Sequence, residues 1–384
     1  MSNSNYLPQQ QVTFPENFIV ILIHGWTETA SNMNTLVNTM RGLGSIESYW
    51  NCVFPDITIT KDDLPGNSNV FSRIQNEYNI KANANVFIKI AFTHEEEGPV
   101  IEQSEELADV IEHLRAVFPT KKIATVGYSK GGVVAMECAV DYPGYIDNLI
   151  SVATPYTTTI AEHLYGFVAD CLQSILNGVS LLHILNHPAE YLTLYVLFAT
   201  NTVENLFRNA VNNVINGKIV MPNLKQRWNQ MTNHPSFTPI ATRALTITNS
   251  EEEIFESDFV VPVESALADG FYGKKYSDDI LLIRNQTKRI TVQTSQYTSG
   301  TYDLANLITK VNGLTNVSTT LGLIDFFATF FPVLFSIVDE SNETKIQTAK
   351  YAHANLPVIR DFLGSTDYAL KNEEVAWRVL AGLK

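Results

Sequence analysis

Apolar runs and helical patterns alternate along the first part of the chain. Unbroken apolar stretches, rich in β-branched residues, occur at residues 18–23 (FIVILI), 85–92 (NVFIKIAF), 123–126 and 149–153. Such runs, without polar alternation, are typical of parallel strands that helices cover on both faces. Residues 104–118, with Ser104 as cap, and residues 132–141 lie between these strands and space their apolar side chains for helices. The alternation predicts an α/β fold with a mostly parallel central sheet.

The pattern changes after residue 158, where long apolar helical stretches replace the strand signals. Strand signals return at residues 241–248, with a further pair at residues 280–283 and 289–294, and a second apolar helical stretch follows. We interpret the two helical stretches as insertions into one core. The predicted segments are 12–158 (core, first part), 159–238 (helical cap), 239–298 (core, second part), 299–344 (second helical insertion) and 345–384 (core, with the C-terminal helix).

Within the second insertion, residues 321–338 (LGLIDFFATFFPVLFSIV) approach the length of a membrane span. Asp325 and Pro332 interrupt the run, and both disfavour a helix that crosses a bilayer. A buried or interfacial helix explains the run as well. We therefore expect no span, and at most a transient contact with a membrane surface or lipid aggregate.

Composition narrows the classes of partner and compartment. The chain has 384 residues, of which 45% are hydrophobic, so it is long enough to bury a substantial core. Its 26 basic and 40 acidic residues give a net charge of −14, which repels phosphate backbones and predicts no nucleic-acid partner. Three cysteines and a polar start without a secretory signal favour a reducing compartment, and we expect the cytoplasm by default.

The strongest chemical signal is Gly127-x-Ser129-x-Gly131, which directly follows an apolar strand and directly precedes a helix. A serine on such a tight turn has its hydroxyl raised above the sheet, and the turn is so cramped that small residues must flank it. The positive end of the helix would favour an anion formed during acyl transfer. The alternative is a glycine-rich turn with an incidental serine. The context favours Ser129 as a nucleophile.

A second signal, His24-Gly25-Trp26, stands at the end of the first apolar strand. Acyl-transfer sites of this type take one oxyanion N–H from the residue after the nucleophile and another from an earlier strand-end loop. Lys130 and Trp26 would supply these backbone N–H groups. We expect His24 to brace the loop rather than to react. For the Lys130 side chain we expect exposure to solvent, with attraction of an anionic head group as the alternative.

Together, IVILIHGW at residues 19–26 and VGYSKGGVVAMECAVDYPGYIDNLISVATP at residues 126–155 resemble the bacterial lipase and esterase branch of the α/β-hydrolases. The resemblance implies an α/β-hydrolase fold with a mainly helical cap. It also implies a triad in the chain order serine, acid, histidine. The two insertions match no relative, so the resemblance does not imply a particular substrate.

The resemblance also guides the choice of histidine and acid. Of the eight histidines, His353 alone follows the acid candidates and precedes a terminal helix, as the family's histidine loop does. The alternatives after the serine are His163, His183, His187 and His234. Asp258 is the preferred acid because residues 258–266 (DFVVPVESA) are similar to the family's acid segment, and Glu256 is the alternative. The acidic run at residues 251–253 has no histidine or cysteine beside it, which indicates a solvated face rather than a metal site.

These residues predict a serine-dependent carboxylic-ester hydrolase of lipase or esterase type, with phospholipase activity included, that needs no metal or organic cofactor. The apolar insertions favour a lipid-like or other apolar ester as the substrate. An acyltransferase, a thioesterase or an amidase would use the same triad. A binding or scaffolding protein without catalytic activity is the alternative from another class.

Overall fold

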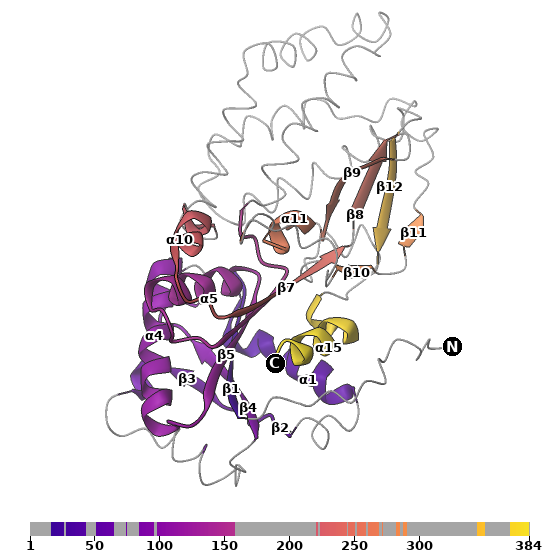
Figure 1. The fold of residues 1–384 in the computed structure, drawn as a ribbon. Coiled ribbons are helices and arrows are strands. Elements are labelled where there is room, and N and C mark those ends of the chain that lie inside the picture. Colours follow the sequence, from indigo (N-terminus) through magenta and orange to yellow (C-terminus); the bar gives the residue numbers. More distant parts are fainter. Residues whose placement is uncertain are drawn as a thin grey trace, which may run out of the picture.

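The computed structural model describes residues 17–26, 28–43, 51–64, 74, 84–95, 98–157, 220–221, 223–243, 245–249, 252–258, 260–268, 271, 282–284, 287–289, 344–349 and 369–383. These residues build a central sheet, helices on its two faces and a second, smaller sheet (Figure 1).

The central sheet has eight described strands in the order β10-β7-β6-β5-β1-β4-β2, with β3 also paired to β4. All of these pairs are parallel. The strands are β1 (Phe18–Ile23), β2 (Cys52–Val53), β3 (Thr58–Thr60), β4 (Asn85–Ala91), β5 (Lys122–Tyr128), β6 (Asn148–Val152), β7 (Ser236–Arg243) and β10 (Leu282–Arg284). The predicted parallel sheet is therefore confirmed.

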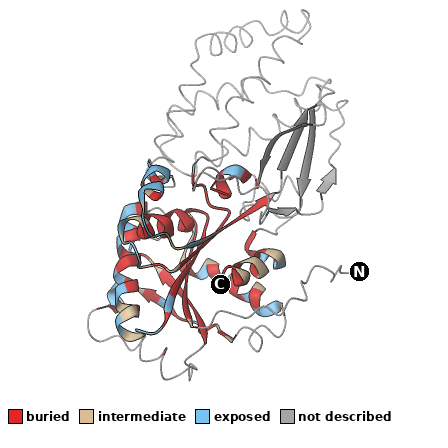
Figure 2. Cartoon of the chain, in the orientation of Figure 1, coloured by how far each residue is buried: buried red, intermediate tan, exposed pale blue. Residues whose placement is uncertain are grey.

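The four apolar runs of the sequence form the middle of this sheet. Every residue of β1 and β6 is buried, and β4 and β5 each have one residue that is not buried. Burial on both faces is why these strands need apolar residues at consecutive positions. Figure 2 shows the result as a buried centre between partly exposed helices.

Two layers of helices cover the sheet (Figure 1). One face packs against α4 (Val100–Val117) and α5 (Lys130–Asp141), and the other packs against α1 (Asn34–Gly42) and α15 (Glu373–Ala381). The remaining described helices are α10 (Leu224–Gln230), α11 (Val263–Ala266), η1 (Ala30–Met33), η2 (Lys61–Asp63) and η6 (Ala369–Lys371). The two apolar clusters lie on opposite faces of the sheet, as the alternation of side chains along a strand requires.

The helix α4 differs from the prediction at its start. It begins at Val100 after Pro99, and not at Ser104. Ser104 lies inside the helix, is buried, and its hydroxyl donates to the Ile101 carbonyl at 2.8 Å. Proline suits the position before a helix, so Pro99 sets the start and Ser104 is left to hydrogen-bond within the helix.

The second sheet was not predicted. It is antiparallel, with the order β11-β12-β8-β9. Its strands are β8 (Leu245–Asn249), β9 (Glu252–Ser257), β11 (Thr287–Arg289) and β12 (Thr344–Ala349). The single strand expected at residues 241–248 is thus divided: β7 ends in the central sheet at Arg243, and β8 continues in the second sheet.

The predicted cap ends earlier than residue 238. The side chain of Trp228 in α10 is fully buried in the core cluster that lies under α5. Arg227 forms ion pairs with Glu137, at 2.6 Å, and with Asp141, both on α5. Because these contacts and β7 belong to the core, the core resumes no later than residue 224. Residues 159–219 and 299–343 lie outside the described residues.

Membrane-spanning segments were searched within the described part of the chain. No helix there is long and apolar enough to cross a bilayer. The apolar run at residues 321–338 lies outside the described residues.

Candidate active site

Ser129 occupies the one-residue turn between β5, which ends at Tyr128, and α5, which starts at Lys130. Its backbone angles are φ 52° and ψ −125°, a conformation that residues other than glycine rarely adopt. Such strain costs about 1–3 kcal/mol and is concentrated at functional sites. The strained turn brings Ser129 directly to the N-terminus of α5, as the motif predicted.

Three glycines make this turn possible. A Cβ atom on Gly127 would overlap the backbone of Gly132, and one on Gly131 would lie 2.5 Å from the Ile23 carbonyl oxygen. A Cβ atom on Gly132 would overlap the side chain of Thr154. The glycines therefore allow α5 to start tightly against β1 and the end of β6.

The loop after β1 passes beside the serine. A Cβ atom on Gly25 would be 3.1 Å from the Cβ of Ser129. The Gly25 N–H donates to the Glu28 carboxylate at 3.1 Å, which closes the loop on itself. Among the described residues, the Trp26 backbone N–H donates to no backbone carbonyl. The loop is thus next to the nucleophile candidate, and the role of Trp26 as an oxyanion donor stays a prediction.

His24 is buried at the base of this loop. Its Nδ1 lies 2.9 Å from the Gly25 carbonyl oxygen, and its ring contacts that of Phe92 at a centroid distance of 5.7 Å. Burial, the largest effect, lowers the pKa of His24. A neutral, buried imidazole that holds its neighbour's carbonyl fits the bracing role that the sequence suggested.

The Lys130 side chain contradicts the expectation of solvent exposure. It is 1% exposed, and its ammonium group donates to the carbonyl of Gly98, in the residues before α4. The reason is tertiary: the first ten residues of α5 are all buried. The position after Ser129 therefore faces protein, and the alternative of an exposed cation for a head group is excluded as well.

Asp258 lies immediately after β9 and is fully buried. Its Oδ1 accepts hydrogen bonds from the N–H groups of Val260, at 3.0 Å, and Val261, at 2.7 Å. Thr242, near the end of β7, donates to Oδ2 at 3.4 Å. The hairpin of β8 and β9 thus leaves the central sheet and returns the chain to the end of β7.

Ser129 and Asp258 both lie at the carboxyl ends of strands of the central sheet. Ser129 follows β5, Asp258 contacts the end of β7, and β6 separates the two strands. Two strand spacings correspond to roughly 10 Å. The role of Asp258 as the acid of a triad stays a prediction.

The other candidates are placed as follows. His353 lies outside the described residues, as do His163, His183 and His187. His234 precedes β7, at the opposite edge of the sheet from Ser129, and its Nε2 is 2.7 Å from the Trp228 carbonyl oxygen. Glu256 lies within β9, paired with Thr246 of β8. The position of His234 removes it as a partner of the serine.

The comparisons with known proteins bear on this arrangement. Residues 8–162 match the model of a family described as "Alpha/beta hydrolase of unknown function (DUF915)". The described core has the α/β-hydrolase fold. A comparison of the chain with curated proteins finds no match.

Solved structures similar to this chain include the product of the gene lin2722 from Listeria innocua, with 14% identity and a TM-score of 0.37 over 69% of this chain and 82% of that chain. Phospholipase PlaB from Legionella pneumophila has 15% identity and a TM-score of 0.25, over 38% of this chain and 27% of that chain. Lipase BlEst2 from Bacillus licheniformis, in mature form, has 14% identity and a TM-score of 0.24, over 42% and 49%. Likeness at this level carries no argument about activity.

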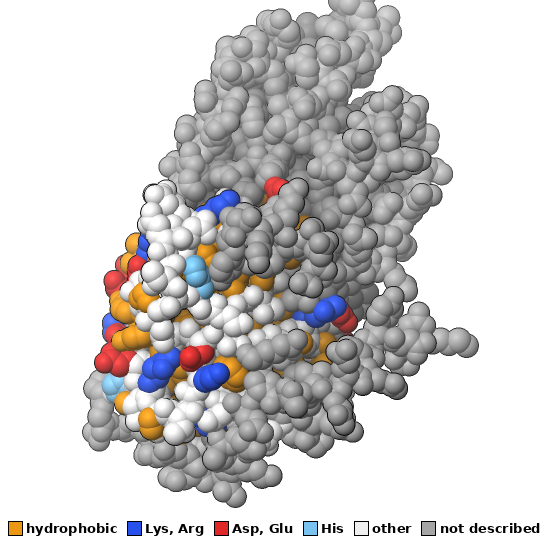
Figure 3. Space-filling model, viewed as in Figure 1, with side chains coloured by type: hydrophobic (Ala, Val, Ile, Leu, Met, Phe, Trp, Pro, Cys, Tyr) orange, Lys and Arg blue, Asp and Glu red, His pale blue; other side chains and the backbone are white. Residues whose placement is uncertain are grey.

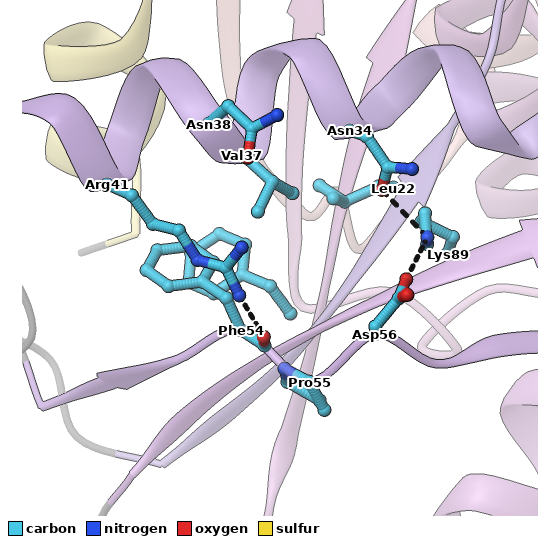
Figure 4. A pocket seen from close by; sticks show the side chains of 10 residues that line it. Leu22, Asn34, Val37, Asn38, Arg41, Phe54, Pro55, Asp56 and Lys89 are labelled. Atoms are coloured by element: carbon cyan, nitrogen blue, oxygen red, sulfur yellow. Dashed lines mark hydrogen bonds and ion pairs between the residues drawn. The ribbon is translucent and has the colours of Figure 1, made fainter.

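A cavity of about 220 Å³ lies away from this site, between α1 and the central sheet (Figure 4). Lys89 of β4, only 5% exposed, donates there to Asn34 at 2.7 Å and to Asp56 at 2.8 Å. The hydrogen bond from Lys89 lowers the pKa of Asp56. The predicted site residues do not line this cavity. Its one sequence signal was a lysine within an apolar run.

Within the described residues, we looked for a second site among metal-ligating side chains and surface charges. The part of the chain that the structure describes contains no group of three His, Cys, Asp or Glu side chains that could hold a metal ion. On the face shown in Figure 3, acidic and basic side chains of the described residues are interspersed. Among the described residues, the candidate site thus consists of the serine turn, the loop beside it and the buried Asp258.

Proposed function

We propose that this α/β-hydrolase is a serine-dependent carboxylic-ester hydrolase of lipase or esterase type. The observation that carries the proposal is the strained backbone of Ser129, with φ 52° and ψ −125°, between β5 and α5. A protein that only needed a connection between strand and helix would gain stability from glycine or an unstrained turn. Glycine would relieve the strain but has no hydroxyl group, so the hydroxyl is what serine contributes at this position.

In the proposed mechanism, the Oγ of Ser129 attacks the acyl carbon, and His353 accepts the proton and passes it to the leaving alcohol. Asp258 orients His353 and stabilises its charged form. The backbone N–H groups of Trp26 and Lys130 stabilise the oxyanion. Water then attacks the acyl-enzyme, with His353 as the base, and releases the acid. No metal or organic cofactor takes part in this proposed chemistry.

We further propose an apolar, lipid-like acyl ester as the substrate, including phospholipids. The support comes from the apolar composition of the stretches at residues 160–206 and 302–338. Helices of this composition beside an active site line acyl pockets or open onto lipid aggregates. The cytoplasm is the proposed location, since Cys52 and Cys138 are buried free thiols.

Labelling with a fluorophosphonate probe tests the nucleophile. We expect covalent labelling of the purified protein, and none of Ser129→Ala. Ser151→Ala is the matched control, because Ser151 is also buried, lies in the neighbouring strand β6, and has no hydrogen-bond partner for its hydroxyl among the described residues. Labelling that persists in Ser129→Ala would contradict the assignment. A folded wild-type protein that the probe does not label would support a binding protein instead.

A series of p-nitrophenyl esters of increasing acyl length, compared with phospholipid and triglyceride emulsions, tests the substrate class. We expect kcat/KM to rise from acetate to longer chains. A steady fall from acetate upward would contradict an apolar acyl pocket. Preference for a thioester or an amide over the matched ester would change the reaction class and leave Ser129 as the nucleophile.

A further inference from the structure

The segment between β4 and α4, residues 92–99, contacts both parts of the candidate oxyanion site. We call its described residues, 92–95 and 98–99, the β4–α4 loop. On one side, the Lys130 ammonium group donates to the Gly98 carbonyl. On the other side, Glu95 accepts a hydrogen bond from the Ala30 N–H at 3.1 Å, and Phe92 packs on His24. One loop therefore touches the serine turn and the loop after β1.

The β4–α4 loop is itself well fixed. The Gly98 N–H donates to the His94 carbonyl at 3.1 Å. The side-chain amide of Gln103, on α4, donates to the same carbonyl at 2.7 Å and to the Glu95 carbonyl at 3.2 Å. A Cβ atom on Gly98 would overlap the backbone of His94. A contact made to this loop is thus held in place by α4.

The burial of Lys130 requires an explanation. Removing an ammonium group from water costs free energy, which an apolar side chain such as methionine would avoid. The positive charge of Lys130 also acts on His24: burial lowers the pKa of His24 most, and the Lys130 charge lowers it further. What lysine provides and methionine lacks is a donor that reaches the Gly98 carbonyl.

We propose that the Lys130 side chain is a positioning residue, which ties the serine turn to the β4–α4 loop and thereby fixes the two oxyanion N–H donors relative to each other. The inference rests on the proposed function. The donors belong to Trp26 and Lys130, on two separate loops, and their mutual position decides whether both reach the same oxygen. Misplacing a reacting or stabilising group by about 1 Å costs roughly 100-fold in rate.

Lys130→Met tests this, with Lys121→Met as the matched control. Lys121 is also buried, and its ammonium group also donates to a backbone carbonyl, that of Ala84 at 2.6 Å. It lies just before β5, at the opposite end of that strand from Ser129. The two variants therefore remove the same kind of contact at the two ends of one strand.

The readouts are kcat and KM for p-nitrophenyl butyrate, the rate of fluorophosphonate labelling, and the melting temperature. For Lys130→Met we expect kcat and the labelling rate to fall about 10- to 100-fold with KM changed less than about threefold. For Lys121→Met we expect kcat within about twofold of wild type, whatever its melting temperature. Partial recovery of kcat in Lys130→Arg is expected, because arginine keeps a donor.

Glu95→Ala keeps the inference testable if Lys130→Met does not fold. Glu95 is only partly buried, and its replacement cuts the contact between the β4–α4 loop and Ala30. We expect a fall in kcat of about 3- to 30-fold, again without a matching rise in KM. Glu102→Ala, at an exposed position on α4, is its control and should leave kcat unchanged.

The inference and the proposed function fail in different ways. A labelled, active wild type together with Lys130→Met or Glu95→Ala at wild-type kcat overturns the inference alone. Equal losses of kcat in Lys130→Met and Lys121→Met also overturn it, because they would mean a general effect of stability. A folded wild type that is neither labelled nor active overturns both.

Discussion

The serine turn and the acid position are built in opposite ways. The turn uses consecutive residues, and its conformation follows from the glycines that flank Ser129. Asp258 reaches the sheet edge only after the chain has left β7, formed the hairpin of β8 and β9, and returned to Thr242. The surroundings of Ser129 can be predicted from a sequence motif, because neighbouring residues determine them. The surroundings of Asp258 depend on residues from another strand, so only the tertiary structure shows them.

The largest expected effect concerns the triad as a unit. We expect His353→Ala to lower kcat as far as Ser129→Ala does, by roughly 10³-fold or more, and Asp258→Asn somewhat less. The acid mainly orients the histidine, which is why its loss costs less. Steady-state kinetics with p-nitrophenyl butyrate measure all three. Glu256→Gln is the control for the acid, and a greater loss there than in Asp258→Asn would transfer that role to Glu256.

The next effect tests whether the serine turn needs glycine at position 132. Gly132→Ala places a Cβ atom on the Thr154 side chain, so we expect a loss of about 2–3 kcal/mol in the free energy of unfolding, measured with urea. Gly42→Ala, at the end of α1 with nothing within 4 Å of the added atom, should be neutral or stabilising by up to about 1 kcal/mol. Equal effects of both substitutions would mean that the turn is not cramped.

A smaller change in the free energy of unfolding, of opposite sign, is expected from Ser129→Gly. Glycine adopts positive φ without strain, so the free energy of unfolding should rise by about 1 kcal/mol while activity disappears. Ser151→Gly in β6 is the control and should instead lower stability by about 1 kcal/mol. A loss of stability in Ser129→Gly would contradict the strain.

The smallest effect belongs to the acid position. Thr242→Val keeps the shape of the side chain and removes its 3.4 Å hydrogen bond to Asp258. Two backbone N–H groups still hold the carboxylate, so we expect kcat to fall only about 2- to 5-fold. A loss of kcat as large as that of Asp258→Asn would show that the hydrogen bond from Thr242, and not the turn at residues 258–261, positions Asp258.

Helix starts and the identity of side-chain neighbours were predicted less well than the four strands in the middle of the central sheet. The pattern at residues 104–118 was correctly assigned to a helix, but Pro99 sets its beginning at Val100. Lys130 was expected in solvent because its place at a helix start says nothing about what packs over it. The contacts of Lys89 were not predicted, because a single lysine within an apolar run does not indicate which distant residues it contacts.

By itself, the sequence determined the parallel sheet and the serine turn. Strands buried on both faces need continuous apolar runs, and a one-residue turn between strand and helix needs glycines at fixed offsets, so both leave local marks. Only the tertiary structure decided the second sheet, the burial of Lys130 and the meeting of Asp258 with Thr242. These features depend on contacts between residues far apart in the chain, and a local pattern of apolar and polar positions does not encode which distant segment supplies the partner.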